Sequence, residues 1–446
     1  MFDAEDSIVV PDNLDDYIKK GIASGIKKKK VNRTKFAANA AVVCLLLLFT
    51  VFIRTSPVFA AYVTKIPGLE YLVRLINHDK GLQSAVENNF IQNINSSITK
   101  EGITFTIKDT IIDKYKALIF YSIENNKDSK FIELAEVKLI DEKGKELPVG
   151  VGWSVSRPDE KVGNKKVEDK IEISFIEEGT LPNNLHLEIK LRELDSYDDI
   201  NKVKTMIDGI WTYDIPVNKK KIEAMEKSYS LNKQINIDGQ KVTFKKVMIT
   251  PIRAAVEVEY DENNSKKVLG YDDIKIVDEK GNQWGTIING VSGSRKNDSH
   301  ETIYFQSNYF NSPKHLYIKA SNVRAVDKDK ANVVVDIESS KLLKAPDEKL
   351  KLMRVDKGET ETRITFSLER DKLFDEKLGY FIFSGTFKDS NGKAYHENHC
   401  ETYSESVNEQ TINFIIDNNS DIKGPIFLEL YNYPQRIISD FEVRIK

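Results

Sequence analysis

The order of apolar and polar residues divides the chain into a short polar beginning, one long apolar run and a long region of alternating residues. The apolar run, Phe36–Ile53, holds eighteen residues without a charge. At about 1.5 Å per residue, a helix of this length spans about 27 Å, close to the roughly 30 Å hydrocarbon core of a bilayer. We therefore predict a transmembrane helix over residues 36–54.

Basic residues lie almost entirely before this run, and they set its expected orientation. Lys27–Lys30 and two further cations precede it, whereas only Arg54 and Lys65 follow closely. Because loops rich in Lys and Arg stay in the cytoplasm, we expect residues 1–35 inside the cell and the region after about residue 55 outside. Two alternatives remain open: cleavage of a signal peptide after Ala60, and a soluble helix buried in a core.

The predicted cytoplasmic tail carries apolar residues at helical spacing. Five side chains fall at i, i+3, i+4, i+8 and i+12, on one face of a helix: Leu14, Tyr17, Ile18, Ile22 and Ile26. A tail of about 35 residues has no core of its own, so this stripe needs a partner to bury it. We predict that these residues bind a cytoplasmic partner protein in a groove. The alternative is a helix lying on the inner leaflet, held by Lys27–Lys30 and anionic lipid.

The region outside the membrane begins with helical spacing and continues with strands. We predict a helical membrane-proximal linker over residues 55–97. From residue 98 onward β-branched and aromatic residues alternate with polar ones, for example in Ala254–Tyr260 and Arg363–Leu368. Short alternating strands with frequent turns are typical of β-sandwiches. The predicted fold is therefore mainly β, with tandem immunoglobulin-like β-sandwiches preceded by one transmembrane helix and short helices.

A repeated order of strands divides this β region into three units. Val137–Gly144 (VKLIDEKG) and Ile274–Gly281 (IKIVDEKG) are nearly identical, and Lys388–Lys393 forms the corresponding turn of a third unit. Such a hairpin needs one residue with positive φ, which the glycine supplies. After these turns, Leu185–Lys190 of the first unit matches His315–Ala320 of the second.

These repeats give the expected domain boundaries. Sandwich 1 is expected over residues 98–218, sandwich 2 over residues 231–340 and sandwich 3 over residues 350–446. Residues 219–230 and 340–349 are predicted linkers. Trp211–Val217 is the expected closing strand of sandwich 1, and the strand over residues 441–445 is assigned to sandwich 3.

Composition adds limits on partners and covalent links. The chain has 446 residues and a formal net charge of -3, so global charge does not favour nucleic acid as a partner. It has two cysteines, and Cys44 lies in the predicted transmembrane helix. Cys44 and Cys400 are therefore not expected to pair, and the outer units must be stable through their hydrophobic cores.

Residues suited to catalysis or metal binding are sparse. The strongest cluster is His396, His399 and Cys400 with two neighbouring glutamates, but its spacing is not that of H-E-x-x-H. We find no Gly-rich phosphate loop, nucleophile elbow or calcium loop in the sequence. We therefore predict no enzyme, no cofactor and no metal site. An outward-facing enzyme built on this cluster is the alternative.

Several segments carry a resemblance to a known family. They are Pro11–Ile26, Ile66–Val73, Lys80–Phe90, Glu101–Phe105, Trp211–Val217 and Ile237–Phe244 followed by Thr250-Pro251. The layout resembles a membrane-anchored Gram-positive family with a domain of unknown function 4179 followed by a domain of unknown function 5643. The residues that carry the resemblance are structural in character.

The resemblance implies a regulator. Proteins of this kind look like the transmembrane partners of extracytoplasmic-function sigma factors, in which the cytoplasmic segment holds the sigma factor inactive. The outer sandwiches would then sense an envelope signal, an unknown extracellular ligand or a wall component. The tail contains no His or Cys, so it lacks the zinc motif of the zinc-containing anti-sigma class. A structural or adhesive cell-envelope protein without a signalling role is the alternative.

Overall fold

The computed structural model describes most of the chain from residue 69 onward. The described residues are 69–76, 78–125, 131–153, 166–175, 181–194, 205–287, 292–375, 379–406, 408–418 and 421–446. The predicted tail and transmembrane helix lie outside them. Across the described helices, none has both the length and the apolar composition that a bilayer crossing requires. The chain divides into two compact units, Met1–His78 and Asp79–Lys446, which we describe separately.

The described part of the first unit is one short helix, α3 (Glu70–Ile76). Leu72 and Ile76, four residues apart, lie on the same face of this helix, and both are buried. The helix falls inside the predicted linker over residues 55–97 and has the helical character expected there.

The second unit opens with α4 (Lys80–Glu87), which is capped by Asp79. The Asp79 carboxylate accepts a hydrogen bond from the backbone N–H of Leu82 at 3.0 Å. The chain then enters β1 (Gln92–Lys100), which begins before the predicted start of β structure at residue 98. The sequence missed this boundary because β1 (QNINSSITK) is polar and mostly exposed, so its alternation is weak.

The first β-sandwich-like part pairs a five-stranded sheet, β1-β2-β3-β6-β5, with a sheet of β4, β7, β8 and β9. Its further strands are β2 (Ile103–Ile112), β3 (Lys116–Asn125), β4 (Phe131–Ile140), β5 (Val149–Trp153), β6 (Lys166–Phe175), β7 (Asn184–Leu194), β8 (Thr205–Met206) and β9 (Trp211–Pro216). Alternate residues of both sheets point inward and form one core, in which Phe105 stacks on Tyr121. Inward-facing Trp211 is fully buried, as expected for a core aromatic.

The second part follows without a long linker. Residues 219–230, predicted as a linker, contain α5 (Lys219–Glu223) and the start of β10 (Lys227–Ile237). The further strands are β11 (Gln240–Ile249), β12 (Arg253–Tyr260), β13 (Lys266–Tyr271), β14 (Lys275–Asp278), β15 (Gln283–Gly285), β16 (Gly293–Asn297), β17 (His300–Gln306) and β18 (Leu316–Asp327). One sheet has the order β10-β11-β12-β17-β16 and the other β13-β18-β14-β15.

The third part has its own core and two more sheets. Its elements are η1 (Lys328–Lys330), β19 (Asn332–Asp336), β20 (Lys341–Lys344), β21 (Leu350–Lys357), β22 (Glu361–Glu369), α6 (Lys372–Asp375), β23 (Phe383–Lys388), β24 (Ala394–His396), β25 (His399–Ser406), β26 (Glu409–Asp417) and β27 (Ile426–Leu430). The sheet orders are β20-β19-β27-β23-β24 and β21-β22-β26-β25. Residues 340–349, predicted as the second linker, therefore include a paired strand.

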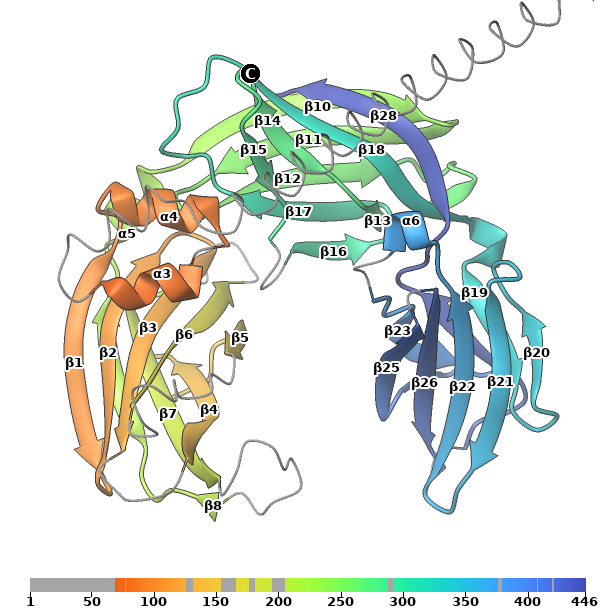
Figure 1. The fold of residues 1–446 in the computed structure, drawn as a ribbon, viewed down its shortest axis with the longest axis horizontal. Helices are drawn as coiled ribbons and strands as arrows, with labels where there is room; N and C mark the ends of the chain where they lie inside the picture. The colour runs from red at the N-terminus through yellow and green to blue at the C-terminus, as the bar shows by residue number, and fades with distance from the viewer. Residues whose placement is uncertain are drawn as a thin grey trace, which may run out of the picture. The chain divides into compact units, whose positions relative to one another are not determined.

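The last strand of the chain, β28 (Arg436–Arg444), belongs to the second part and not to the third. It pairs with β18, with Val443 opposite Ile318, and its inner side chains join the second core. Figure 1 shows β28 beside β18. In the first part β9 pairs with β7 in the same way, with Tyr213 opposite Leu187.

In the third part, the strand that takes the place of β9 and β28 is β19, which comes at the start of that part's sequence and not at its end. There β19 pairs with β27, with Val333 opposite Leu428. The strand assignments therefore differ from the expected ranges 231–340 and 350–446: residues 332–344 join the third part, and residues 436–444 join the second. Alternating apolar residues predict a strand but do not say which sheet it enters, which is why the sequence missed this exchange.

The three predicted hairpin turns share one conformation. Gly144, Gly281 and Gly392 have φ of +79°, +83° and +79°, which confirms the reason for glycine at these positions. In each turn an aspartate carboxylate accepts backbone N–H groups from the following residues; the aspartates are Asp141, Asp278 and Asp389.

The strands β7 and β18 correspond to each other with a shift of one residue from the predicted alignment. Leu139 lies opposite Leu187, and its counterpart Ile276 lies opposite Ile318. Leu187 therefore corresponds to Ile318, not to Tyr317. The burial pattern requires this register, because a one-residue slip would turn the inward-facing side chains out of the core.

Replacing an inward-facing residue of β28 tests whether this strand completes the second core. We expect Val443→Asp to lower the free energy of unfolding by at least about 3 kcal/mol, because it places a carboxylate in an apolar core. Ile438→Asp, on the exposed side of the same strand, should change it by about 0.5 kcal/mol or less. Amide hydrogen exchange in β18, measured on the full chain, reports the change in stability of both variants. Equal protection in the two variants would contradict the assignment.

Candidate functional site

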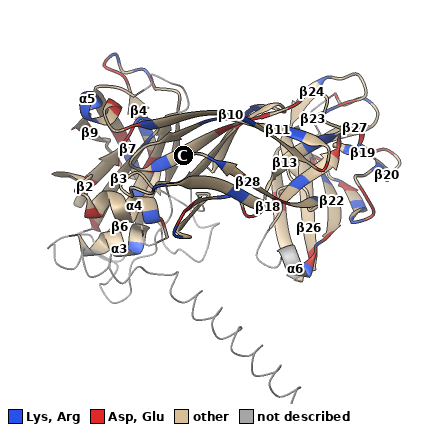
Figure 2. Ribbon diagram, turned by 90° about the horizontal axis from the view of Figure 1, so that it is seen from above, with Lys and Arg blue, Asp and Glu red and all other residues tan. Residues whose placement is uncertain are grey.

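The residues predicted to bind a partner, Leu14, Tyr17, Ile18, Ile22 and Ile26, lie outside the described residues. The structure therefore does not test whether they form one face. Within the described part, the candidate sites are two cavities and two charged networks where β-sandwich-like parts meet. Lys and Arg positions are interspersed with Asp and Glu positions along the described strands (Figure 2).

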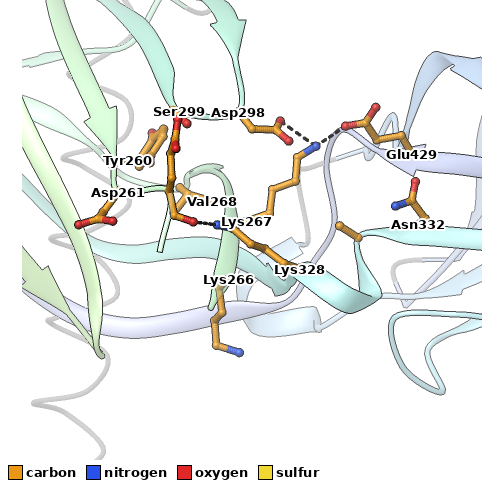
Figure 3. A pocket seen from close by; sticks show the side chains of 12 residues that line it. Tyr260, Asp261, Lys266, Lys267, Val268, Asp298, Ser299, Lys328, Asn332 and Glu429 are labelled. Atoms are coloured by element: carbon orange, nitrogen blue, oxygen red, sulfur yellow. Dashed lines mark hydrogen bonds and ion pairs between the residues drawn. The ribbon is translucent and has the colours of Figure 1, made fainter. Parts of the chain in front are cut away.

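The first cavity lies beside β13, β19 and β27 and has a volume of about 250 Å³. Lys267 of β13 extends across it with only 8% of its side chain exposed. Its ammonium group lies 2.9 Å from Asp298 Oδ1 and 2.5 Å from Glu429 Oε1 (Figure 3). Because Glu429 comes from β27 and Asp298 from the turn before β17, Lys267 joins the second and third parts.

The other lysines around this cavity also have partners. Lys328 Nζ donates to the backbone carbonyl of Glu262 at 2.5 Å, and Lys266 Nζ lies 2.5 Å from Asp327 Oδ1. Among the described residues, no group of three or more His, Cys, Asp or Glu side chains is placed to hold a metal ion. The arrangement around Lys267 is therefore suited to holding two parts of the chain together.

A second charged network connects the same two parts through Arg436 at the start of β28. Arg436 Nε donates to Asp272 Oδ2 at 2.5 Å, and its terminal nitrogen bonds Asp375 and the Tyr380 hydroxyl. Arg324 of β18 lies 3.1 Å from the other oxygen of Asp272. Two guanidinium groups and two carboxylates thus balance their charges at this junction.

Burial and pairing act in opposite directions on Arg436. Burial disfavours its charge, but Asp272 and Asp375 outweigh this effect and raise the pKa of Arg436. The Asp375 side chain is fully buried and also accepts the backbone N–H of Asp371. Removing Arg436 would therefore leave a buried carboxylate without its cation.

The first and second parts meet through Asp113, which follows β2. Its carboxylate accepts the Thr250 hydroxyl at 2.5 Å and the backbone N–H groups of Tyr115 and Lys116. Nearby, Arg253 donates to the carbonyl of Tyr115 at 2.8 Å. Burial lowers the pKa of Arg253, and the charge of Asp113 opposes that shift. This joint is polar and fixed by side chains from both parts.

The His–Cys cluster noted in the sequence is spread along two strands. His396 ends β24, whereas His399 and Cys400 lie on β25. His399 Nε2 lies 3.3 Å from Glu401. Burial, aided by the charges of Glu397 and Glu401, raises the pKa of the Cys400 thiol to about 12. Such a thiol remains protonated at neutral pH and is a poor nucleophile.

Sequence reasoning missed the residues of both ion-pair networks. Lys267 bonds a partner 162 positions away and Arg436 one 164 positions away, so no local spacing connects them. The available signal was a cation within an otherwise apolar strand, as for Lys267 in KKVLGY. A charged residue at an inward position of a strand indicates a buried ion pair, but it does not identify the partner.

Comparison with protein families agrees with the resemblance stated above. Residues 28–125 match a domain of unknown function 4179, and residues 226–343 match a family of unknown function 5643. The two expected domain matches are therefore present in the expected order, in a chain whose described part is mainly β. More particularly, the first match ends with β3, and the second runs from the start of β10 to β20.

Other comparisons add little. No curated protein is significantly similar to the chain. Among solved structures, "The crystal structure of the conserved domain protein from Bacillus anthracis" is 13% identical, with a TM-score of 0.38 over 80% of this chain and 92% of that one. This TM-score is too low to assign a shared fold.

Arg436→Met tests the second charged network. We expect a loss of about 3–5 kcal/mol in the free energy of unfolding, because Asp375 would stay buried without its cation. Lys319→Met is the matched control. Lys319 pairs with Glu442, which lies on β28 as Arg436 does, and both side chains of this pair are about half exposed. It should cost about 1 kcal/mol or less. Urea unfolding followed by fluorescence measures both, and similar losses would contradict the account.

Alkylation tests the state of Cys400. With a pKa of about 12, only about one thiol in ten thousand is ionised at pH 8. In a Cys44→Ser background, iodoacetamide should therefore react at least about 100-fold faster with urea-unfolded than with folded protein. The folded rate should rise with pH toward 12. A folded rate equal to the unfolded rate would show that Cys400 is an ordinary exposed thiol.

Proposed function

We propose that this protein is a single-pass membrane regulator whose cytoplasmic helix binds an extracytoplasmic-function sigma factor. The observation that carries the proposal is the apolar stripe Leu14–Ile26 next to the basic run and the predicted transmembrane helix. The outer region would consist of immunoglobulin-like sandwiches that sense an envelope signal. The protein would lie in the cell membrane with its N-terminus in the cytoplasm and its C-terminal region outside.

The matched family segments support this reading. The domain of unknown function 4179 covers residues 28–125 and therefore includes most of the basic run, the predicted membrane helix and the start of the first β-sandwich-like part. A single family unit that combines these three elements is consistent with coupling across a membrane. The order of the two families is that of the anti-sigma-like proteins that the sequence resembles.

The chemistry of the stripe favours docking in a groove. Burial of each large apolar side chain contributes about 1.5–3 kcal/mol, so five of them supply ample energy for a specific contact. In the predicted helix, Gly21 and Gly25 would fall on the same face and would allow a close approach of the partner. Asp15 and Asp16 would lie near the N-terminus of the predicted helix, where negative side chains are stabilising. A sigma factor held this way would be kept from the transcription machinery.

The joints of the described region suit a sensor of this kind. Asp113 ties the first part to the second, and Lys267 and Arg436 tie the second to the third. A displacement of the third part would therefore act on the second through two ion-pair networks and two strand connections. This supports transmission through the outer region as part of the proposal.

A binding experiment with the tail tests the proposal. Full-length protein in detergent is immobilised, and capture of purified sigma factors from the same cell is measured. We expect Leu14→Asp with Ile18→Asp to abolish capture, because both charges fall on the apolar face. Ala23→Asp is the matched control, since it lies about 180° from Leu14 around the helix. Capture that survives the double change would refute the docking site.

The alternative of a structural or adhesive envelope protein predicts a different outcome. Deleting residues 1–30 would then leave sigma-dependent transcription unchanged. Deleting the β-sandwich-like parts would instead weaken attachment of the cell wall or surface. A reporter assay in the cells that carry the deletion separates these outcomes.

A further inference from the structure

We propose that a second cavity, between β13, β16 and the residues after β27, binds a neutral carbohydrate. The cavity has a volume of about 310 Å³, at the lower end of the range for small-molecule sites. Its main lining residues are Tyr271, Arg295, Glu301, Arg324, Tyr431 and Asn432. It is separate from the cavity that contains Lys267.

One wall of the cavity is a fixed set of polar groups. Arg295 donates to Glu301 Oε2 at 2.7 Å and to the carbonyl of Val268 at 2.9 Å. Tyr260 also donates to Glu301 Oε2, at 2.7 Å. Arg295 and Glu301 each have only 16% of their side chains exposed, so their positions are set before any ligand arrives. Fixed donors and acceptors lower the entropy cost of binding a polar ligand.

A further part of the lining is held by Arg324. Its guanidinium donates to Asn432 Oδ1 at 2.5 Å, which fixes the amide beside the cavity. Gly270 makes room for this guanidinium: a Cβ there would lie 2.8 Å from an Arg324 nitrogen. Gly270 also has φ of +155°, where side chains are strained. The glycine is therefore part of how the wall is built.

An aromatic ring completes the site. Tyr431 lines the cavity and is 58% exposed, so its ring offers an apolar face beside the polar walls. Ser292, Ser294 and Thr286 add hydroxyl groups to the lining. An aromatic face together with planar amide, guanidinium and carboxylate groups can contact both the C–H face and the hydroxyl groups of a sugar ring.

The polar and charged groups of the lining favour one class of ligand over others. Arg295 is paired with Glu301, and Arg324 with Asp272, so the charged groups of the lining already have partners of opposite sign and do not call for a charged ligand. An apolar ligand would separate the serine and threonine hydroxyls of the lining from water, at a cost of about 1–3 kcal/mol for each hydroxyl. A neutral polyhydroxylated molecule supplies a donor and an acceptor at every hydroxyl. It therefore matches the mixed lining best.

This site deepens the proposed function, because it names the class of envelope ligand that the outer region would sense. It rests on that function in one respect: envelope carbohydrate reaches the cavity only if this region lies outside the membrane. Binding of a sugar to purified protein does not depend on the tail. Failure of sugar binding and failure of sigma-factor capture are therefore separate results.

Saturation-transfer NMR with the full chain in detergent tests the site. The probes are three neutral tetrasaccharides: the β-1,4-linked N-acetylglucosamine tetramer, cellotetraose and maltotetraose. We expect saturable binding of at least one of them. Tyr431→Ala should weaken it about tenfold, which corresponds to about 1.4 kcal/mol. Ser294→Trp, which fills the cavity from the exposed face of β16, should abolish it.

Tyr403→Ala is the matched control, because Tyr403 is a similarly exposed aromatic on β25, away from this lining. It should leave binding unchanged. An unchanged melting temperature in each variant shows that folding is intact. Absence of saturable binding to all three probes, or an equal loss in Tyr403→Ala and Tyr431→Ala, would overturn the proposal.

Discussion

The pairing of β28 with β18 is the constraint on which the described structure depends. The last strand of the chain supplies Ile437, Val443 and Ile445 to a core whose other strands end more than a hundred residues earlier. The whole third part lies between β18 and β28 in sequence, so the second part holds it at both ends. The matched family segment, residues 226–343, stops before the strand that completes its own sheet.

This exchange explains why charged residues gather where the second and third parts meet. The chain crosses between them twice, and each crossing lies near an ion-pair network. Lys267 pairs with Glu429, which lies near the end of β27. Arg436, at the start of β28, pairs with Asp375 of α6. Buried ion pairs often add little net stability, because desolvation offsets their attraction. Their effect here is on geometry: each fixes which side chains face each other at the junction.

The sequence was most informative where local chemistry decides the structure. Turn glycines such as Gly144 and the repeated segments Val137–Gly144 and Ile274–Gly281 could be assigned because a hairpin needs positive φ at one position. The sequence was least informative about which distant strands pair with each other in the fold. Nothing in the alternation of β19 or β28 shows that the two strands exchange places, since each has apolar residues suited to either core. The polar strand β1 was missed because exposure on both faces leaves little alternation to read.

The same distinction applies to the candidate sites. The stripe Leu14–Ile26 is a local pattern that the sequence can suggest, and it stays a prediction, whereas the ion pairs of Lys267 and Arg436 depend on a fold that brings distant segments together. The central claim of the account is that the stripe holds a sigma factor. The most direct measurement places a photo-reactive amino acid at Tyr17 in living cells and identifies the crosslinked protein by mass spectrometry. The account predicts a sigma factor as the main product, and crosslinks to lipid alone would contradict it.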